Sequence, residues 1–343
     1  MAGLAAAAHA RLRGAEVLLL EKTGRAGGSM LLSSGVIWRH LDFGRFREEC
    51  PEGDEALQRT LFDRLDGDLD WLESLGAPVT ERDTPNPLTT GRRFDTGGLT
   101  RALVDAAGEP RLGTPLTELP GDAPVLLATG GFAASRELVR RHVTPLADQL
   151  FLRAAPGSTG DGLRLGLAAG GHQTAGLDQA YGRNMPAPPA RPGEDVLVPL
   201  TQLYARHAEV SNERGERYSV RTWSEIDVFQ WTALQPGARA WFRVSDEGLR
   251  ERVRERTVGD MVQAAEEAGA PVSRERGAVT VETVAGITTT LGGLAIDREA
   301  RAADGVYAAG ADAGGVATGG YASGLAAALV FGRIAAESAL ASR

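Results

Sequence analysis

The first residue with potential chemistry is a carboxylate at the end of an apolar segment. The run AEVLLL (15–20) is followed by Glu21, and Gly3 opens the alanine-rich stretch before it. In the fingerprint Gly-x-Gly-x-x-Gly, an acid about 20 residues beyond the glycines hydrogen-bonds a ribose of a bound dinucleotide. The spacing fits if Gly3 is the third glycine, so Gly3 and Glu21 are candidate cofactor contacts.

The elements around Glu21 match the second half of a βαβ unit. Residues 3–13 are rich in Ala, Leu and Arg and predict a helix capped by Gly14, and residues 15–20 predict a strand. The first strand of the unit and the first two glycines would then lie upstream of Met1. The alternative is an amphipathic N-terminal helix and a strand without a ligand.

Glycine and hydroxyl residues follow this acid and recur at the ends of other predicted strands. Backbone amides in such loops can hold a pyrophosphate or the edge of a flat ring, and ligands of open α/β sheets bind at strand ends. The candidate contacts in 21–38 are Lys22, Gly27, Gly28, Ser29, Ser33 and Gly35. Those in ATGGF (128–132) are Ala128, Thr129 and Gly130.

Two further glycine-rich turns each lead into a predicted helix. A helix N-terminus directs partial positive charge at the loop before it, which suits an acidic side chain or the negative charge of a reduced flavin. The candidates are Gly160 and Asp161 in STGDG (158–162), Gly310 and Asp312 in the last glycine loop, and Ser323, Gly324 and Leu325 after it. For Asp161, simple helix capping is the alternative.

The predicted elements indicate an α/β protein with an insertion. Apolar runs that end in glycine predict strands, and apolar spacing predicts helices. The strands are expected at 124–132, 291–297 and 305–315, and the helices at 55–75, 98–107 and about 322–340. Proline-rich turns, tryptophans and charged helices dominate between about 170 and 285. We therefore expect one domain in two parts, 1–165 and 286–343, and a second domain, 166–285, inserted into it.

Composition excludes several kinds of partner. The net charge is −8, and arginines are interleaved with acids, whereas nucleic-acid binding needs concentrated basic residues. The single cysteine, Cys50, rules out an internal disulfide or a cysteine-based metal cluster, so we expect a buried or half-buried thiol and no metal site. No apolar run is expected to reach the roughly 18 residues of a membrane span, and no signal peptide is evident. A cytoplasmic protein is expected.

Seven motifs occur in the order found in one family of flavoproteins. They are GGSMLLSSGVIW, ATGGF, STGDG, NERGERY, TLGGLAID, VYAAG and SGLAAALVFGRIA. Together they resemble the FAD-dependent superfamily of fumarate reductases and 3-ketosteroid 1-dehydrogenases over the whole chain. The resemblance implies a Rossmann-like FAD-binding domain and an inserted α+β capping domain that closes over flavin and substrate.

The resemblance also implies roles for the candidate cofactor contacts. Glu21 would hold the AMP ribose, and the residues from Gly27 to Ser29 would lie at the pyrophosphate and the N5 side of the flavin. The residues from Ser323 to Leu325 would lie at the O2 region of the isoalloxazine. Asp312 would replace, from the next position, the ribityl-binding acid of the family, where this chain has Ala311. Because no residue matches a flavin-attaching histidine, non-covalent FAD is expected.

Departures from the family pattern bear on the substrate. Fumarate reductases have a histidine before TxGG, an arginine in the final glycine loop and an arginine proton donor. This chain has Thr289 at the first of these positions, Gly319 at about the second and Glu225 near the third. A dicarboxylate needs cations, so a neutral, fairly apolar substrate is expected. Tyr321 lies in the final glycine loop, where steroid 1-dehydrogenases also have a tyrosine.

The leading hypothesis is a dehydrogenase or reductase that acts on a carbon–carbon bond adjacent to a carbonyl. One hydrogen would move as hydride to or from flavin N5, and the other as a proton exchanged with a side chain. The candidates for proton transfer are Tyr321, Tyr181 and Glu225, with Arg183 as a carbonyl polariser. The partners expected are a small-molecule substrate and an electron donor or acceptor whose identity the sequence leaves open.

Two other interpretations remain open at this point. One is a truncated, flavoprotein-like domain without catalysis, which the missing βα start and Ala311 support. The other is a fumarate-reductase-like enzyme. An NAD-linked dehydrogenase is disfavoured because no second dinucleotide fingerprint is present.

Overall fold

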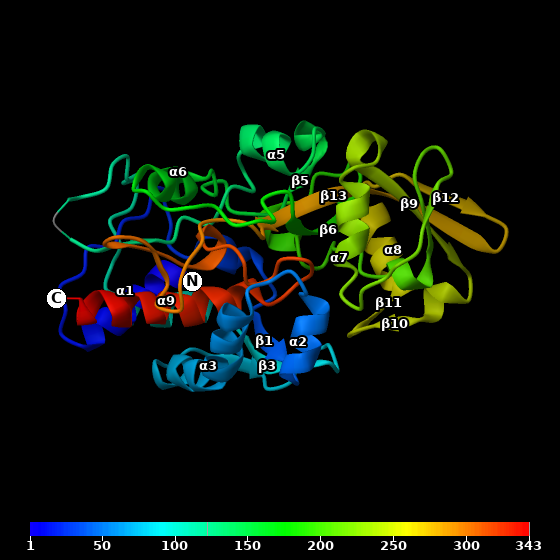
Figure 1. Ribbon diagram of the computed structural model, residues 1–343. Coiled ribbons are helices and arrows are strands. Elements are labelled where there is room, and N and C mark those ends of the chain that lie inside the picture. Colours follow the sequence, from blue (N-terminus) through cyan, green and yellow to red (C-terminus); the bar gives the residue numbers. More distant parts are fainter. Residues whose placement is uncertain (122, 343) are drawn as a thin grey trace. The chain divides into compact units, whose positions relative to one another are not determined.

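The chain has a mixed α/β fold made of two compact units. The computed structural model describes residues 1–121 and 123–342 (Figure 1). Unit 1 comprises Met1–Ser135, Ala155–Gln179 and Thr289–Arg343, and unit 2 comprises Arg136–Ala154 and Ala180–Thr288. Each unit has its own sheets and its own core.

The boundaries between the two units differ from the predicted domain boundaries, which lie at 165/166 and 285/286. Residues 136–154 belong to unit 2 because β5 (Phe151–Leu152) pairs with β13 (Ala278–Thr290). Residues 166–179 belong to unit 1, where the amide of Thr174 donates to the carbonyl of Gly293. Long-range pairing, which composition does not reveal, sets these boundaries. The roles of the units as FAD-binding and capping domains stay a prediction.

Four helices build most of the core of unit 1. α1 (Ala2–Leu12) lies beside α9 (Gly324–Ala341), as Figure 1 shows. A Cβ at position 332 would lie 2.6 Å from the carbonyl oxygen of Ala2, so the close approach of the two helices requires Gly332. The apolar faces of α3 (Glu55–Ser74) and α4 (Thr96–Ala107) complete this core. The predictions of these four helices are confirmed.

The strands of unit 1 are shorter than the sequence indicates. β4 (Val125–Leu127) pairs in parallel with β15 (Val306–Ala308), which pairs with β14 (Arg301–Ala303). A separate antiparallel sheet has the order β1–β3–β2, formed by β1 (Val36–His40), β2 (Val79–Glu81) and β3 (Thr89–Phe94).

Two predicted strands of unit 1 are wrong. In 15–20, only Leu20 forms a bridge, to Arg111, and in 291–297 only Leu294 forms bridges, to Gln173 and Ala313. Both segments are apolar, but a strand needs a neighbouring backbone in register along its length, and each segment has one at a single residue. Apolar composition alone therefore overestimates the sheet.

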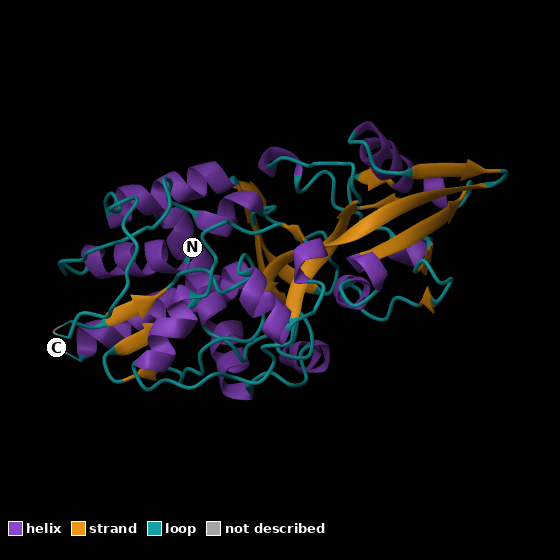
Figure 2. Ribbon diagram, turned by 90° about the horizontal axis from the view of Figure 1, so that it is seen from above, coloured by secondary structure: helices purple, strands orange, loops and turns teal. Residues whose placement is uncertain are grey.

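Unit 2 is built on one long sheet, visible in orange in Figure 2. Its central strand β13 pairs on one side with β12 (Val272–Glu275) and on the other with β9 (Arg239–Ser245). The sheet continues from β9 to β7 (Glu209–Ser211) and β8 (Arg217–Tyr218), and β6 (Ala180–Pro186) also pairs with β13. The core between this sheet and α8 (Val258–Glu267) includes Phe242, Met261 and Val281.

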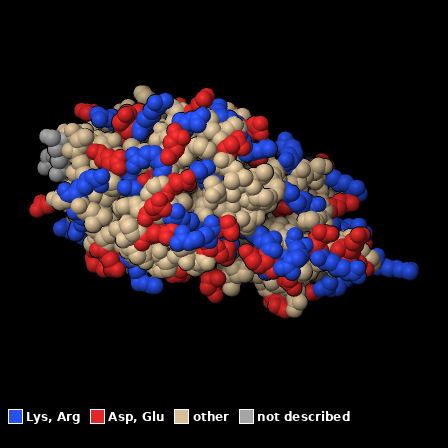
Figure 3. Space-filling model, turned by 90° about the horizontal axis from the view of Figure 1, so that it is seen from below, with Lys and Arg blue, Asp and Glu red and all other residues tan. Residues whose placement is uncertain are grey.

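The remaining α-helices and strands are short. They are α2 (Phe43–Glu49), α5 (Arg136–His142), α6 (Asp161–Ala168), α7 (Ile226–Thr232), β10 (Arg252–Val253) and β11 (Arg256–Thr257). Basic and acidic side chains intermix on the face shown in Figure 3. Cys50 is fully buried, as predicted.

One prediction about membrane spans needs correction. Within the described part of the chain, α9 is long and apolar enough to cross a membrane by length and composition, with a mean hydropathy of 1.4 over 18 residues. The prediction that no run reaches this length is wrong. Half of this window is buried inside the structure, against α1 and α3. A core helix passes the same test, so α9 is weak evidence for a membrane span.

A polar cluster is buried where α1, α3 and α9 meet. The ring of His9 is fully buried, and its Nδ1 accepts a hydrogen bond from Arg333 Nε at 3.1 Å. Arg333 also pairs with Asp68, and Arg64 holds Glu337 through two hydrogen bonds of 2.9 and 3.0 Å. Burial, and then the neighbouring guanidinium groups, lower the pKa of His9 from 6.5 to about 4. His9 is therefore neutral at pH 7.

The low pKa of His9 predicts a loss of stability in acid. Between pH 6.5 and about 4, the unfolded chain binds a proton at His9 that the folded protein does not, so the stability falls as the pH falls. The shift corresponds to about 3 kcal/mol, because one pKa unit is worth about 1.4 kcal/mol. In His9→Asn, whose amide oxygen keeps an acceptor near Arg333, urea unfolding should lose correspondingly less stability between pH 7 and 4. His172→Asn, at an exposed histidine, is the control. An identical pH dependence in His9→Asn and wild type would contradict the assignment.

Candidate functional site

A buried carboxylate joins two segments of unit 1. Asp312 is 1% exposed, and it accepts hydrogen bonds from the amide of Thr129, from Thr129 Oγ1 at 3.0 Å, and from the amides of Gly130 and Gly131 at 3.2 Å each. Burial raises the pKa of Asp312, and these hydrogen bonds oppose the shift. The carboxylate thus ties the turn after β15 to the turn after β4.

The same turn is linked to the start of α6. Thr129 Oγ1 accepts a hydrogen bond of 2.9 Å from the amide of Gly162. A Cβ at position 162 would lie 2.5 Å from the carboxyl carbon of Asp312, so glycine is required there. Gly160 precedes the helix in the left-handed conformation with φ 88°. The predicted contacts Thr129, Gly130, Gly160 and Asp312 therefore lie together.

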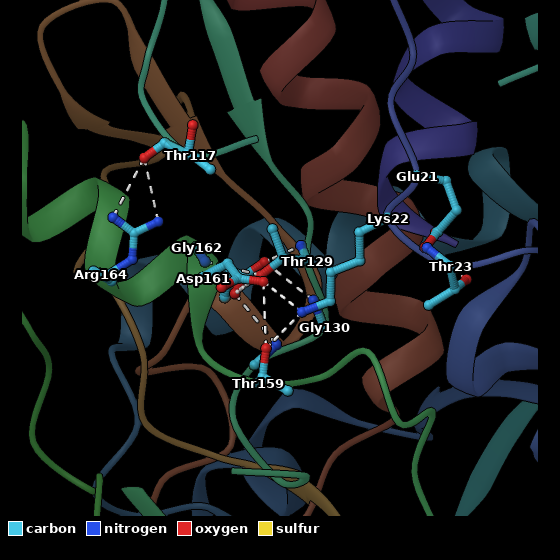
Figure 4. Close-up of polar contacts among 12 residues, drawn as sticks. Glu21, Lys22, Thr23, Thr117, Thr129, Gly130, Thr159, Asp161, Gly162 and Arg164 are labelled. Carbon is cyan, nitrogen blue, oxygen red and sulfur yellow. Dashed lines mark hydrogen bonds and ion pairs between the residues drawn. The ribbon is translucent and has the colours of Figure 1, made fainter. Parts of the chain in front are cut away.

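Lys22 and Asp161 form an ion pair beside this turn. Lys22 Nζ lies 2.5 Å from Asp161 Oδ2 and donates to Thr159 Oγ1 at 2.5 Å, as Figure 4 shows. Glu21 Oε1 accepts hydrogen bonds from the amide and the hydroxyl of Thr23, both at 2.8 Å. Lys22 of the first acid-bearing segment and Asp161 of STGDG are thus brought together as an ion pair.

Small residues allow close packing next to these polar groups. A Cβ at Gly3 would lie 3.4 Å from the Cβ of Ala128, so α1 contacts the end of β4 at this point. A Cβ at Gly310 would lie 3.5 Å from the Cβ atoms of Ala2 and Ala328, which belong to α1 and α9. Gly3, Ala128 and Gly310 therefore mark the junction of these two helices with the parallel strand pair.

The loop of 27–35 combines an open position with constrained ones. Gly27 and Gly28 have φ values of +107° and +53°, and a Cβ at Gly28 would meet no atom within 4 Å. Ser29 Oγ accepts from the amide of Ala155 at 2.9 Å. Ser33 Oγ accepts from the amide of Gly35 at 3.1 Å, and so shapes the turn before β1. Gly28 is thus the residue of this loop that leaves open space.

The start of α9 also combines an open position with constrained ones. Ser323 Oγ caps the helix by accepting from the amide of Ala326 at 3.3 Å. A Cβ at Gly324 would meet no atom within 4 Å, and Leu325 packs against the core of unit 1. A ligand could therefore approach the N-terminus of α9 at Gly324.

Two buried hydroxyl groups were missed by the sequence analysis. Within the described part of the chain, Thr290 Oγ1 and Thr318 Oγ1 are buried and make no hydrogen bond. Thr290 lies next to Gly131, since a Cβ there would be 2.7 Å from its hydroxyl oxygen. Its place directly before LGG in TLGGLAID is the signal that could have identified it. A buried polar atom without a partner needs an explanation, and a hydrogen bond to a bound group is one such explanation.

Three of the predicted catalytic residues lie close together in unit 2. Arg183 Nε donates to the phenol oxygen of Tyr181 at 3.1 Å, and the guanidinium carbon lies 5.2 Å from the centre of the Tyr181 ring. Arg183 also donates to the carbonyl oxygen of Ser224, next to Glu225. Arg183 is only 7% exposed. A phenol and a permanent cation are thus adjacent.

Glu225 is occupied by contacts within unit 2. Its carboxylate accepts from the amides of Ala205 and Arg206 at 3.3 and 3.2 Å, and Arg206 Nε lies 3.5 Å away. Glu225 itself has φ 57°, a strained conformation for a residue with a side chain. These contacts favour a structural role, and a catalytic role of Glu225 stays a prediction.

Tyr321 belongs to unit 1 and is held against the segment 38–50. Its ring meets the Trp38 ring edge to face, with centroids 5.6 Å apart. A Cβ at Gly320 would lie 1.6 Å from the carbonyl oxygen of Glu49, so the backbone before Tyr321 packs directly on the end of α2.

Among the described residues, no group of three or more His, Cys, Asp and Glu side chains could hold a metal ion.

Two named proteins are similar to this chain in sequence. The fumarate reductase (cytochrome) of Shewanella frigidimarina is 25% identical, over 98% of this chain and 75% of its own length. The vinyl phenol reductase of Lactiplantibacillus plantarum is 23% identical, over 63% of this chain and 54% of its own length.

Solved structures show the same fold. A 3-ketosteroid Δ1-dehydrogenase from Sterolibacterium denitrificans has a TM-score of 0.75 at 14% identity, covering 100% of this chain and 98% of its own. The open conformation of a flavocytochrome c3 fumarate reductase has a TM-score of 0.71 at 20% identity, covering 98% and 76%. The family described as FAD binding domain matches residues 1–120 and 109–325. The chain therefore belongs to this family of flavoprotein oxidoreductases, and FAD is its cofactor.

Proposed function

We propose that this FAD-dependent oxidoreductase acts on a carbon–carbon bond adjacent to a carbonyl group, with unit 1 binding FAD and unit 2 acting as the capping domain. The observation that carries the proposal is the pair of Tyr181 and Arg183, in which a cation is hydrogen-bonded to a phenol. The similarity to enzymes named fumarate reductase and 3-ketosteroid dehydrogenase supports the reaction class.

The residues of unit 1 fit a bound FAD. Gly28 and Gly324 leave open space at a loop and at a helix N-terminus, where backbone amides attract anionic groups. The buried hydroxyl groups of Thr290 and Thr318 are available as hydrogen-bond partners. We assign Glu21 to the ribose of the AMP half, and Lys22 with the start of α6 to its surroundings. No residue matches a flavin-attaching histidine, so we propose non-covalent binding.

Proton transfer is assigned to side chains of the chain itself. FAD, when bound, supplies the two-electron redox chemistry. A positive charge beside a phenol stabilises its deprotonated form, so Arg183 prepares Tyr181 to exchange a proton next to a carbonyl. Tyr321 is the second candidate, with its ring orientation fixed by Trp38.

The substrate is proposed to be neutral and fairly apolar. Thr289, Gly319 and Glu225 stand where the family's fumarate reductases have cationic or imidazole groups. Unit 2 does contain two buried arginines, Arg153 and Arg183, so cations are present in it. Arg153 donates to the hydroxyl groups of Thr201 and Thr288. A single polarised carbonyl suits this arrangement better than two carboxylates.

The ribose assignment predicts weaker FAD binding in Glu21→Ala. Loss of a hydrogen bond to a charged group costs about 1.5–3 kcal/mol, which corresponds to a dissociation constant raised about 10- to 150-fold. Titration of the apoprotein with FAD, followed by flavin fluorescence, measures this constant. Glu16→Ala, at an exposed acid of the same segment, should bind FAD as the wild type does. An unchanged dissociation constant in Glu21→Ala would refute the assignment.

The proton-transfer assignment predicts a slow chemical step in Tyr181→Phe. Removal of a general acid or base costs about 10²- to 10⁴-fold in rate, while the flavin spectrum should stay unchanged. Anaerobic stopped-flow measurements of flavin reduction compare Tyr181→Phe, Tyr321→Phe and the control Tyr218→Phe, whose phenol contacts Asp227. The larger loss should occur in Tyr181→Phe. A wild-type rate in that variant excludes Tyr181 as the proton-transfer group.

The substrate class is tested with matched pairs of compounds. A saturated cyclic ketone should reduce the oxidised protein, or the corresponding enone should reoxidise the reduced protein, and fumarate should react at least about 100-fold more slowly than the enone, a difference worth roughly 2.7 kcal/mol. A preference for fumarate would instead support the second candidate function, which the Shewanella relative favours. No reaction with any of these compounds would contradict both.

A further inference from the structure

The turn after β4 has the geometry of an anion-binding nest. Gly130 and Gly131 both have positive φ, at +94° and +71°, and the amides of Thr129, Gly130 and Gly131 all donate to one carboxylate. Consecutive amides that converge in this way form a concave site for a negative charge. The occupant is a side chain of the same protein, Asp312.

The hydrogen bonds to Asp312 occupy all the acceptor sites of its carboxylate. An ionised carboxylate has about four lone-pair sites, and the three amides together with Thr129 Oγ1 supply four donors. Because Asp312 is 1% exposed, no solvent-facing oxygen is left to accept from a ribityl hydroxyl. The role expected from the sequence, a direct contact with FAD, therefore does not suit this side chain.

The surroundings of Asp312 are shaped to hold a carboxylate. Gly162 has no side chain at the point where a Cβ would meet the Asp312 carboxyl group at 2.5 Å. The Gly162 amide is in turn bonded to Thr129 Oγ1, which also donates to Asp312. The carboxylate therefore fixes the carboxyl end of β4 and the first turn of α6 relative to each other.

We propose that Asp312 is a positioning residue whose carboxylate fills the nest of Thr129, Gly130 and Gly131, and so holds the two elements that flank the FAD site without touching FAD. The inference rests on the assignment of FAD to unit 1. Its first readout, the stability of the apoprotein, does not depend on FAD, so the two can fail separately.

Removal of the carboxylate tests the proposal. Asp312→Ala should lower the melting temperature of the apoprotein by about 5 °C or more and weaken FAD binding about tenfold or more. Asp312→Asn should also lose stability, because its NH₂ group faces amide donors. Asp304→Ala, at an exposed acid of unit 1, is the matched control. A wild-type melting temperature with weakened FAD binding would overturn the proposal in favour of direct contact.

Chemical rescue distinguishes a nest from general damage. Sodium formate should bind in the vacated nest of Asp312→Ala and restore part of the lost melting temperature and FAD affinity. Sodium chloride at the same ionic strength should not do so. Equal effects of the two salts on Asp312→Ala would overturn the proposal.

A second variant keeps the proposal testable even if Asp312→Ala does not fold. In the otherwise wild-type protein, which keeps Asp312, Gly162→Ala should destabilise the apoprotein, because the new Cβ meets the carboxylate of Asp312. In Asp312→Ala the same change should be tolerated, since the space is free. In the wild-type apoprotein, hydrogen exchange at the amides of Thr129 and Gly131 should be slow. Fast exchange at these amides, or tolerance of Gly162→Ala with Asp312 present, would overturn the proposal.

Discussion

The hydrogen bonds between Asp312 and the turn after β4 are, in our proposal, the interaction that organises the strand ends of unit 1. β4 and β15 are each three residues long, so strand pairing alone fixes little of the backbone beyond them. The buried carboxylate continues the connection past the strand ends and links it to α6 through Thr129. Because Asp161 begins α6, its ion pair with Lys22 also depends on this connection. Among the residues assigned to FAD and its surroundings, Lys22 and the start of α6 thus share one structural support.

The helices of unit 1 could be predicted from the sequence because they depend on local properties. The regular spacing of Leu57, Leu61 and Leu65 predicts α3, and the alanine-rich composition of α1 and α9 predicts two further helices. The strands at 15–20 and 291–297 could not be predicted correctly, since a strand is defined by a partner elsewhere in the chain. The positions of the unit boundaries depend on pairing of the same kind.

The sequence predicts which residues belong to the candidate site better than it predicts what each residue does there. Glycine pairs and acids at strand ends indicated which segments converge, and Lys22, Gly160 and Asp161 do lie together. The roles of Asp312 and Glu225 depend on which amides face their carboxylates, and no spacing in the sequence encodes that. The hydroxyl of Thr290 could be recognised only from its burial without a partner. Whether a polar side chain has all its hydrogen-bond partners is a property of the folded chain.

The proposed cofactor site in unit 1 holds both halves of FAD. Glu21 is assigned to the AMP half, and the open positions at Gly28 and Gly324 to the rest of the cofactor. Calorimetric titration of the apoprotein with FAD and, separately, with FMN tests this claim most directly. We expect saturable binding of FAD with a stoichiometry of one, and FMN binding at least about tenfold weaker, a difference of about 1.4 kcal/mol. Equal affinities for FAD and FMN, or no binding of FAD, would contradict it.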